Sequence, residues 1–474
     1  MIFSSNVFLF VFLPVFLTAY YATPERYRSW IILFGSYCFY AWWRVDFLLL
    51  FVAVTLWNYL IGLRIEASLD NRRSARFWVT FGVVLNLSTL GYFKYVNFGV
   101  ATVNAVFNQM GMDPWLVTQV ILPIGISFYI FQAISYIIDV YRKDTPATHN
   151  LIDFAAFIAL FPQLIAGPVL RYKDVAHQFQ SRTHSVSKFS EGVQRFMLGF
   201  IKKVIIADSI APLVNAGFAL ENPTMLDTWV TVLAYTAQLY FDFSGYADMA
   251  IGLGLMMGFK FVENFKHPYI SQSITEFWRR WHISLSSWLR DYLYVPLGGN
   301  RNGKVKTYRN LLLTMILGGF WHGANWTFLV WGIWHGSLLA IEKAVGLNVS
   351  AESARDRFVI TRWVLTLFLV MLGWVVFRAE TITSAMTLYA AMFDFSSLYI
   401  SEVYAATIRH SQLAILAAAW VLIVYRGFQQ RAQELGKDFI VMPRVYAALL
   451  IPLFFIALLK LSAQSYSAFL YFQF

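Results

Sequence analysis

The chain has 474 residues, of which 58% are hydrophobic and 13% are charged, and its formal net charge is +11. Soluble domains carry about 25% charged residues, so this composition excludes an ordinary soluble protein and indicates an integral membrane protein. The excess of basic residues does not require a nucleic-acid partner, because membrane proteins concentrate lysine and arginine in their cytoplasmic loops, and we expect no nucleic acid to bind.

Apolar segments of about the length that spans a bilayer follow one another along the whole chain. Lipid cannot hydrogen-bond to free backbone groups, so such segments must be helices, and they are too long and too uniform for barrel strands. With no repeat or linker in sight, residues 1–474 are predicted to form one all-α, polytopic membrane domain of about 10 to 13 spans. The predicted spans are residues 4–22, 29–43, 46–63, 77–93, 119–139, 192–218, 228–257, 310–326, 327–345, 363–379, 411–427 and 441–462.

Basic residues gather in a few loops, which indicates that these loops face the cytoplasm. The N-terminal span and residues 462–474 contain no lysine or arginine, so both ends of the chain are predicted to lie on the outer side. The basic stretches are residues 64–76, 142–143, 171–203, 260–309 and 426–437.

One apolar stretch, residues 152–170, does not fit a simple span. Pro162, Gly167 and Pro168 interrupt it, and basic loops lie on both sides of it. Irregular backbone at membrane depth is tolerated where it is buried in protein or lines a cavity. The pattern therefore favours a re-entrant segment.

Residues 271–296 are predicted to form an amphipathic helix. Ser273 or Thr275 can cap its start, with Glu276 placed as in a capping box. A continuous helix carrying several arginines would lie at the cytoplasmic interface or line a polar cavity, with His282 on its apolar side. The apolar face would hold Trp278, His282, Leu285 and Leu289, and another face Arg279, Ser286 and Arg290.

His322 lies in an uncharged run, where an ionisable residue is expensive and usually functional. A helix that starts after Arg309 would place it about 20 Å along the axis, at middle depth in the bilayer. Neighbouring glycines permit close approach, and Trp321 and Trp326 favour the neutral imidazole that a general base needs. The alternative is that His322 is a buried histidine with a structural role, whose ring nitrogens are simply hydrogen-bonded within the protein. His335 either repeats this pattern on the following helix or packs against the first helix.

Other chemistry finds less support. His282, His322 and His335 could lie close together, but no His-x-x-x-His or Glu-x-x-His spacing occurs, so we predict no metal site. We also predict no bound cofactor. No Gly-x-Ser-x-Gly elbow or phosphate-binding loop is present. Asp242 and Asp248 lie in an apolar run six residues apart, and Gly245 could break a helix between them. Each carboxylate could cap a half-helix or accept a hydrogen bond from a buried tyrosine hydroxyl. Alternatively, each could contact substrate.

The chain resembles bacterial members of the membrane-bound O-acyltransferase (MBOAT) family, and within it those that serve alginate O-acetylation. The resemblance covers essentially the whole chain, and the order of its motifs is highly specific. The motifs are residues 123–129 (PIGISFY), 161–168 (FPQLIAGP), 238–248 (QLYFDFSGYAD), 276–292 (EFWRRWHISLSSWLRDY) and 319–326 (GFWHGANW).

The resemblance implies a ring of helices around a central funnel in the bacterial inner membrane. It implies that His322 and His282 are catalytic, with acetyl-CoA as the cytoplasmic donor and periplasmic or membrane-anchored proteins of alginate acetylation as partners. For the three arginines, contact with anionic lipid or a positive-inside role is the alternative to donor binding. Candidate contacts to substrate or donor are Arg279, Arg280, Arg290, Asp242, Trp321 and Asn325.

Three other functions remain open at this point. The chain could transport an acyl donor or a polymer without chemistry, and it would then tolerate His322→Gln. It could be a scaffold for extracytoplasmic acetyltransferases, in which case changes in the loop at residues 380–408 would abolish assembly. It could also O-acylate a different cell-surface polymer.

Overall fold

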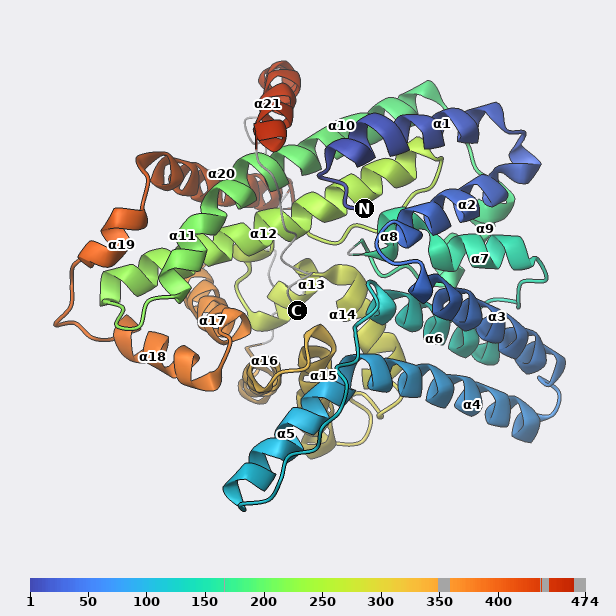
Figure 1. The fold of residues 1–474 in the computed structure, drawn as a ribbon, viewed down its shortest axis with the longest axis horizontal. Helices are drawn as coiled ribbons and strands as arrows, with labels where there is room; N and C mark the ends of the chain where they lie inside the picture. Colours follow the sequence, from blue (N-terminus) through green and yellow to red (C-terminus); the bar gives the residue numbers. More distant parts are fainter. Residues whose placement is uncertain (166, 348–358, 435, 437–442, 464–474) are drawn as a thin grey trace. The chain divides into compact units, whose positions relative to one another are not determined.

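A computed structural model describes the chain except for residues 166, 348–358, 435, 437–442 and 464–474. Every regular element within the described residues is a helix, so the predicted all-α class is confirmed (Figure 1). Each of the twelve predicted spans overlaps a helix. The stretch that suggested an outer C-terminus, residues 462–474, lies almost wholly outside the described residues.

The chain divides into two compact units, Met1–Phe196 with Ala250–Val262, and Met197–Met249 with Glu263–Phe474. The expected single domain therefore stays a prediction, and each unit is described by itself. Two long helices, α10 (Val186–Ile201) and α12 (Met225–Met256), contribute residues to both units.

The first unit is built around α6, in which 14 of 17 residues are buried. Helix α6 packs against α3 and α4, and α7 packs against α2. Short π and 3-10 helices are labelled η. The elements of this unit are η1 (Phe8–Phe12), α1 (Leu13–Ala22), η2 (Glu25–Tyr27), α2 (Arg28–Ala41), α3 (Asp46–Ala67), α4 (Arg72–Leu90), η3 (Gly91–Tyr95), α5 (Val96–Gln109), α6 (Ile126–Arg142), α7 (Leu151–Ala159), α8 (Phe161–Leu164) and α9 (Tyr172–Gln180).

Two predicted segments of this unit differ in detail from the structure. The span predicted at residues 119–139 becomes helical only at Ile126, after Gly125 adopts a φ of 73°. The interrupted stretch 152–170 forms two short helices, α7 and α8, that meet at Leu160, and nearly all of its described residues are buried. The break agrees with the pattern expected of a re-entrant segment, whose position in a membrane stays a prediction.

The second unit carries the two histidines singled out above. Its elements, after the shared α10, are η4 (Lys202–Ala207), α11 (Asp208–Phe218), α12, η5 (Pro268–Ile270), α13 (Ile274–Arg280), α14 (Ile283–Leu289), η6 (Arg290–Tyr294), α15 (Lys304–His322), α16 (Trp326–Val345), α17 (Ile360–Arg378), α18 (Ile382–Met392), α19 (Glu402–Thr407), α20 (His410–Glu434) and α21 (Pro443–Ala463).

Helices α15 and α16 form an antiparallel hairpin whose backbones touch. A Cβ atom on Gly319 would overlap the Phe328 carbonyl, and one on Gly332 would lie 2.5 Å from the carbonyl oxygen of Met315. Small residues at such contacts let helices approach closely without an intervening side chain. Close packing of this hairpin fixes the position of the last turn of α15.

Three helices of the described part are long and apolar enough to cross a membrane, namely α3, α17 and α20. Shorter apolar helices occur at Phe8–Ala22, Ile382–Met392 and Ala448–Ala463. The number of helices that cross the bilayer stays a prediction.

Candidate active site

His322 is the last residue of α15, where Gly323 leaves the helical conformation. The helix begins at Lys304 instead of after Arg309 and ends before Trp326, so the predicted boundaries of this span were wrong at both ends. The side chain is 6% exposed. Carbonyl groups at a helix C-terminus carry partial negative charge, which stabilises a nearby cation.

His282 lies in the break between α13 and α14, with φ 43° and ψ 54°. The single amphipathic helix predicted over residues 271–296 was therefore wrong, because the chain interrupts it at Trp281 and His282. Left-handed backbone is uncommon for residues other than glycine and costs about 1–3 kcal/mol unless its surroundings hold it. The ring of His282 is fully buried.

Asn264, which precedes η5, holds this break in place. Its side-chain oxygen accepts hydrogen bonds from the Ser284 backbone N–H at 3.2 Å and the Ser284 hydroxyl at 2.9 Å. The same oxygen lies 3.2 Å from Nδ1 of His282. The Asn264 carbonyl also accepts from the Ile283 N–H at 3.0 Å. None of the sequence motifs includes Asn264, although asparagine is typical of non-helical positions that bond to the backbone.

The two histidines face one another within a set of aromatic rings, here called the aromatic cluster. Their ring centroids are 6.5 Å apart. His282 stands edge-on to Phe243 at 4.7 Å, and His322 stands edge-on to Trp331 at 5.2 Å. The cluster comprises Phe243, Trp321, Trp331 and Phe377.

His335 also contacts Trp331, whose ring centroid is 4.9 Å from that of His335. It is fully buried, and both of its ring nitrogens lack a hydrogen-bond partner among the described residues. His335 thus shares the Trp331 ring with His322, and whether it repeats the role of His322 or only packs beside it stays a prediction.

Burial affects the protonation of His282. It lies between two seven-residue helices, each too short to span a bilayer. Burial lowers the pKa of His282 to about 3, because the charged form loses its hydration. The ring is consequently neutral at physiological pH.

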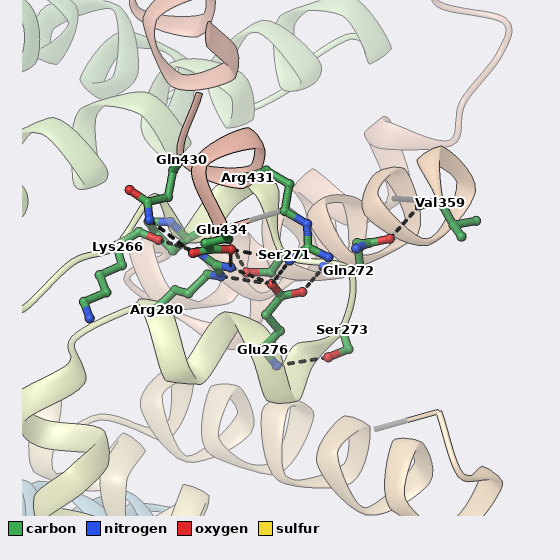
Figure 2. Close-up of polar contacts among 11 residues, drawn as sticks. Lys266, Ser271, Gln272, Ser273, Glu276, Arg280, Val359, Gln430, Arg431 and Glu434 are labelled. Atoms are coloured by element: carbon green, nitrogen blue, oxygen red, sulfur yellow. Dashed lines mark hydrogen bonds and ion pairs between the residues drawn. The ribbon is translucent and has the colours of Figure 1, made fainter. Parts of the chain in front are cut away.

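Ion pairs anchor the helix that precedes His282 (Figure 2). Arg280, at the end of α13, pairs with Glu276 at 2.9 Å and with Glu434 of α20 at 2.7 Å. Arg431 lies 3.6 Å from Glu276. We call these four residues the charge cluster. Its two positive and two negative groups fix the end of α13 against α20.

The start of α13 is equally well held. Ser273 caps the helix by accepting from the Glu276 N–H at 3.0 Å, as predicted. The Glu276 carboxylate accepts from the Gln272 N–H instead of that of Ser273, so the capping box is shifted by one residue. Glu342 of α16 also accepts from the Ile274 and Thr275 N–H groups. A carboxylate at this end complements the helix dipole.

The three candidate arginines differ in their surroundings. Arg280 is 8% exposed and belongs to the charge cluster. Arg279 and Arg290 are exposed, and Arg290 pairs with the neighbouring Asp291 at 2.7 Å. Arg280 is thus buried in ion pairs, whereas Arg279 and Arg290 lie at the surface.

Asp242 and Asp248 both project from α12, which runs unbroken through Gly245, so the suspected helix break there was wrong. Asp242 pairs with buried Lys203 at 2.6 Å, and Asp248 pairs with Lys202 at 2.6 Å. Both carboxylates thus have structural partners on η4, a π-helix of a type often found near functional sites.

Trp321 and Asn325 flank His322 in different ways. Trp321 is 2% exposed, and its ring lies 6.2 Å from that of His282. Asn325 caps α16 by accepting from the Thr327 N–H and donates to the Glu380 carbonyl. Trp321 therefore lies in the aromatic cluster, whereas Asn325 holds the turn after His322.

The chain is similar to several known proteins of one family. The profile of the membrane-bound O-acyltransferase family (MBOAT) matches residues 142–386. A Pseudomonas putida protein named probable alginate O-acetylase AlgI is 58% identical over 492 residues, and one of the same name from Pseudomonas aeruginosa is 54% identical over 524 residues. Both alignments cover 100% of each chain. A Helicobacter pylori peptidoglycan O-acetyltransferase is 37% identical, over 83% of this chain and 80% of the relative.

Proposed function

Because this chain belongs to the membrane-bound O-acyltransferase family, we propose that it catalyses acetyl transfer for the O-acetylation of alginate. The observation that carries the proposal is the pairing of His282 and His322, with ring centroids 6.5 Å apart inside one aromatic cluster. Full-length relatives named for this activity support the choice of polymer.

In the proposed reaction His322 is the general base. It takes the proton of an acceptor hydroxyl while the hydroxyl oxygen attacks the thioester carbonyl carbon. The carbon–sulfur bond then breaks, and the imidazolium returns its proton to the leaving thiolate, so that an ester and a free thiol result. The C-terminus of α15 supports this role, because its carbonyls stabilise the positive charge that His322 acquires.

His282 assists from the opposite side of the cluster. It precedes the first turn of α14, where the helix dipole disfavours positive charge, and its burial keeps the ring neutral. A neutral ring there accepts a hydrogen bond without competing for the proton that His322 holds.

The proposed donor is acetyl-CoA, presented from the cytoplasm. Arg279 and Arg290 are exposed and carry the charge that would attract its phosphates. We place the protein in the bacterial inner membrane, crossing it several times. Periplasmic or membrane-anchored proteins would receive the acetyl group and pass it to alginate.

Acetyl transfer can be tested with purified protein in lipid vesicles. Acetyl-CoA labelled in its acetyl group is added with and without the extracytoplasmic acetylation proteins, and label is followed onto each component. We expect label on an acceptor with wild-type protein and none with His322→Ala. Label held on the chain itself would assign His322 a carrier role, and flux of donor without any transfer would favour a transporter.

A further inference from the structure

One oxygen atom, Oδ1 of Asn264, receives three contacts that together determine the chemical state of His282. The first comes from the backbone N–H of Ser284, which can only donate. The amide atom 3.2 Å from it must therefore be the oxygen and not the nitrogen of Asn264. This backbone contact fixes the orientation of the amide side chain.

The second step concerns the ring of His282. Its Nδ1 lies 3.2 Å from the same oxygen, which carries no hydrogen. A hydrogen bond between them requires the hydrogen to be on Nδ1. A neutral imidazole has a single N–H, so Nε2 of His282 carries a lone pair.

From this geometry we propose that Asn264 is a positioning residue that holds His282 as the Nδ1–H tautomer and keeps Nε2 as a bare acceptor within the aromatic cluster. Nε2 is buried and has no hydrogen-bond partner among the described residues. Buried polar atoms are usually paired. Because the His282 ring lies 6.5 Å from that of His322, its unshared Nε2 is placed to accept a hydrogen bond from a substrate at the proposed site.

Asn264 also fixes the backbone that carries the ring. Its carbonyl accepts from the Ile283 N–H at 3.0 Å, and the Lys266 N–H donates to the Arg280 carbonyl at 2.9 Å. These bonds tie the segment before η5 to both sides of His282. They hold the left-handed conformation in which the ring reaches the cluster.

The tautomer assigns the direction of proton movement. Nε2 of the neutral His282 ring can accept a hydrogen bond, but it has no hydrogen to give. A proton delivered to the leaving thiolate must then come from His322. This consequence rests on the proposed acyl transfer, whereas the tautomer itself does not.

The tautomer is tested by solid-state NMR of protein labelled with ¹⁵N-histidine in lipid bilayers. The His282 signals are assigned by their loss in His282→Gln. We expect the Nδ1–H tautomer in wild-type protein and a mixture in Asn264→Ala. The Nε2–H tautomer in wild-type protein would overturn the proposal. Because this measurement needs no turnover, it stands or fails separately from the acetyltransferase activity.

Ser284→Ala is the matched control, since it removes a different hydrogen bond to the same oxygen. We expect Asn264→Ala to lower kcat by about 10- to 100-fold with little change in KM, as for residues that orient a functional histidine. Ser284→Ala should retain the tautomer and most of the activity. Equal losses in the two variants would indicate a merely structural role.

Asn264→Asp keeps the shape and the accepting oxygen, so it remains informative if the alanine variant does not fold. Its carboxylate would favour protonated His282 and raise the pKa of that ring. The titratable side chain in ring contact with His282 is His322. We expect activity of Asn264→Asp to be lost at a higher pH than that of the wild type as the pH falls. An unchanged pH profile would contradict the proposal.

Discussion

His282 and His322 lie at opposite kinds of helix end, with their ring centroids 6.5 Å apart. His282 precedes the first turn of α14, and His322 closes the last turn of α15. Helix dipoles therefore disfavour a cation at the first ring and favour one at the second. His282 is therefore suited to accept a hydrogen bond as a neutral ring, and His322 is suited to carry a proton.

Substitution of His322 tests its role as a base. Alanine and glutamine should both lower acetyl transfer by at least about 100-fold, because glutamine can form hydrogen bonds but cannot accept a proton. Acetyl content of alginate is measured in cells that rely on the variant, with membrane levels compared by immunoblot. The exposed His410 supplies the control, and His410→Ala should be active. Normal acetylation by His322→Gln would contradict the assignment.

The charge cluster predicts a difference between two adjacent arginines. Arg280→Met leaves Glu276 and Glu434 without their closest cation, whereas Arg279→Met changes an exposed residue. We expect Arg280→Met to lower the free energy of unfolding by about 2–4 kcal/mol, somewhat less than for a fully buried pair. Unfolding in detergent is measured for both variants. A similar stability of the two would show that Arg431 alone compensates both carboxylates.

Asp242 can be assigned to structure or to substrate contact by measuring activity per folded molecule. Asp242→Asn weakens a buried pair with Lys203, so the variant should be less stable. If the carboxylate only balances Lys203, the folded fraction should retain nearly full specific activity. A specific activity reduced more than tenfold in well-folded protein would instead place Asp242 in the reaction.

His267 should contribute to acid sensitivity. Burial lowers its pKa to about 4, and nearby Lys202, Arg426 and Arg280 act in the same direction against Asp248. The unfolded state, with a histidine pKa of about 6.5, then binds the proton first. Stability is full above about pH 6.5 and falls between about pH 6.5 and 4.

His267→Asn removes this titration while tolerating the left-handed φ of 47°. Unfolding free energies in detergent are compared at pH 7.5 and pH 4.5. We expect the loss between these values to be smaller in the variant than in the wild type. An identical loss would assign acid sensitivity to other groups.

The helix hairpin predicts a steric effect at Gly332. Alanine there would place a methyl group against the Met315 carbonyl, and overpacking of this kind costs about 1–3 kcal/mol. Gly99→Ala is the control, because no atom lies within 4 Å of a Cβ at that position. Thermal unfolding should separate the two, with Gly332→Ala less stable and Gly99→Ala unchanged or slightly more stable.

The length of the apolar runs sufficed to place twelve helical segments, because each membrane-buried segment must satisfy its own backbone. It gave no span for α5 or α9. Periodicity failed at His282, where apolar residues continue with helical spacing through the break. The break depends on hydrogen bonds that Asn264, 18 residues before His282 in the chain, accepts from Ile283 and Ser284. A tertiary contact of this kind leaves no local pattern.

The neighbours of His322 show the same limit. Glycine and tryptophan beside it suggested an apolar setting, and Trp321 lies in the aromatic cluster. Phe377, which stands 5.3 Å from the ring, comes from α17 and could not be paired with His322 by spacing alone. Likewise, spacing alone could not show that Arg280 pairs with Glu434 of α20.

The hydrogen bonds that Asn264 accepts from backbone amides also allow the rate at which this site opens to be measured. The amides of Ile283 and Ser284 donate to Asn264 and not to a helical carbonyl, so they exchange with deuterium only when this contact separates. Their exchange times would report how long the break at His282 stays in contact with Asn264. Slower exchange in the presence of donor or partner proteins would mean that these ligands bind preferentially when Asn264 holds the break at His282.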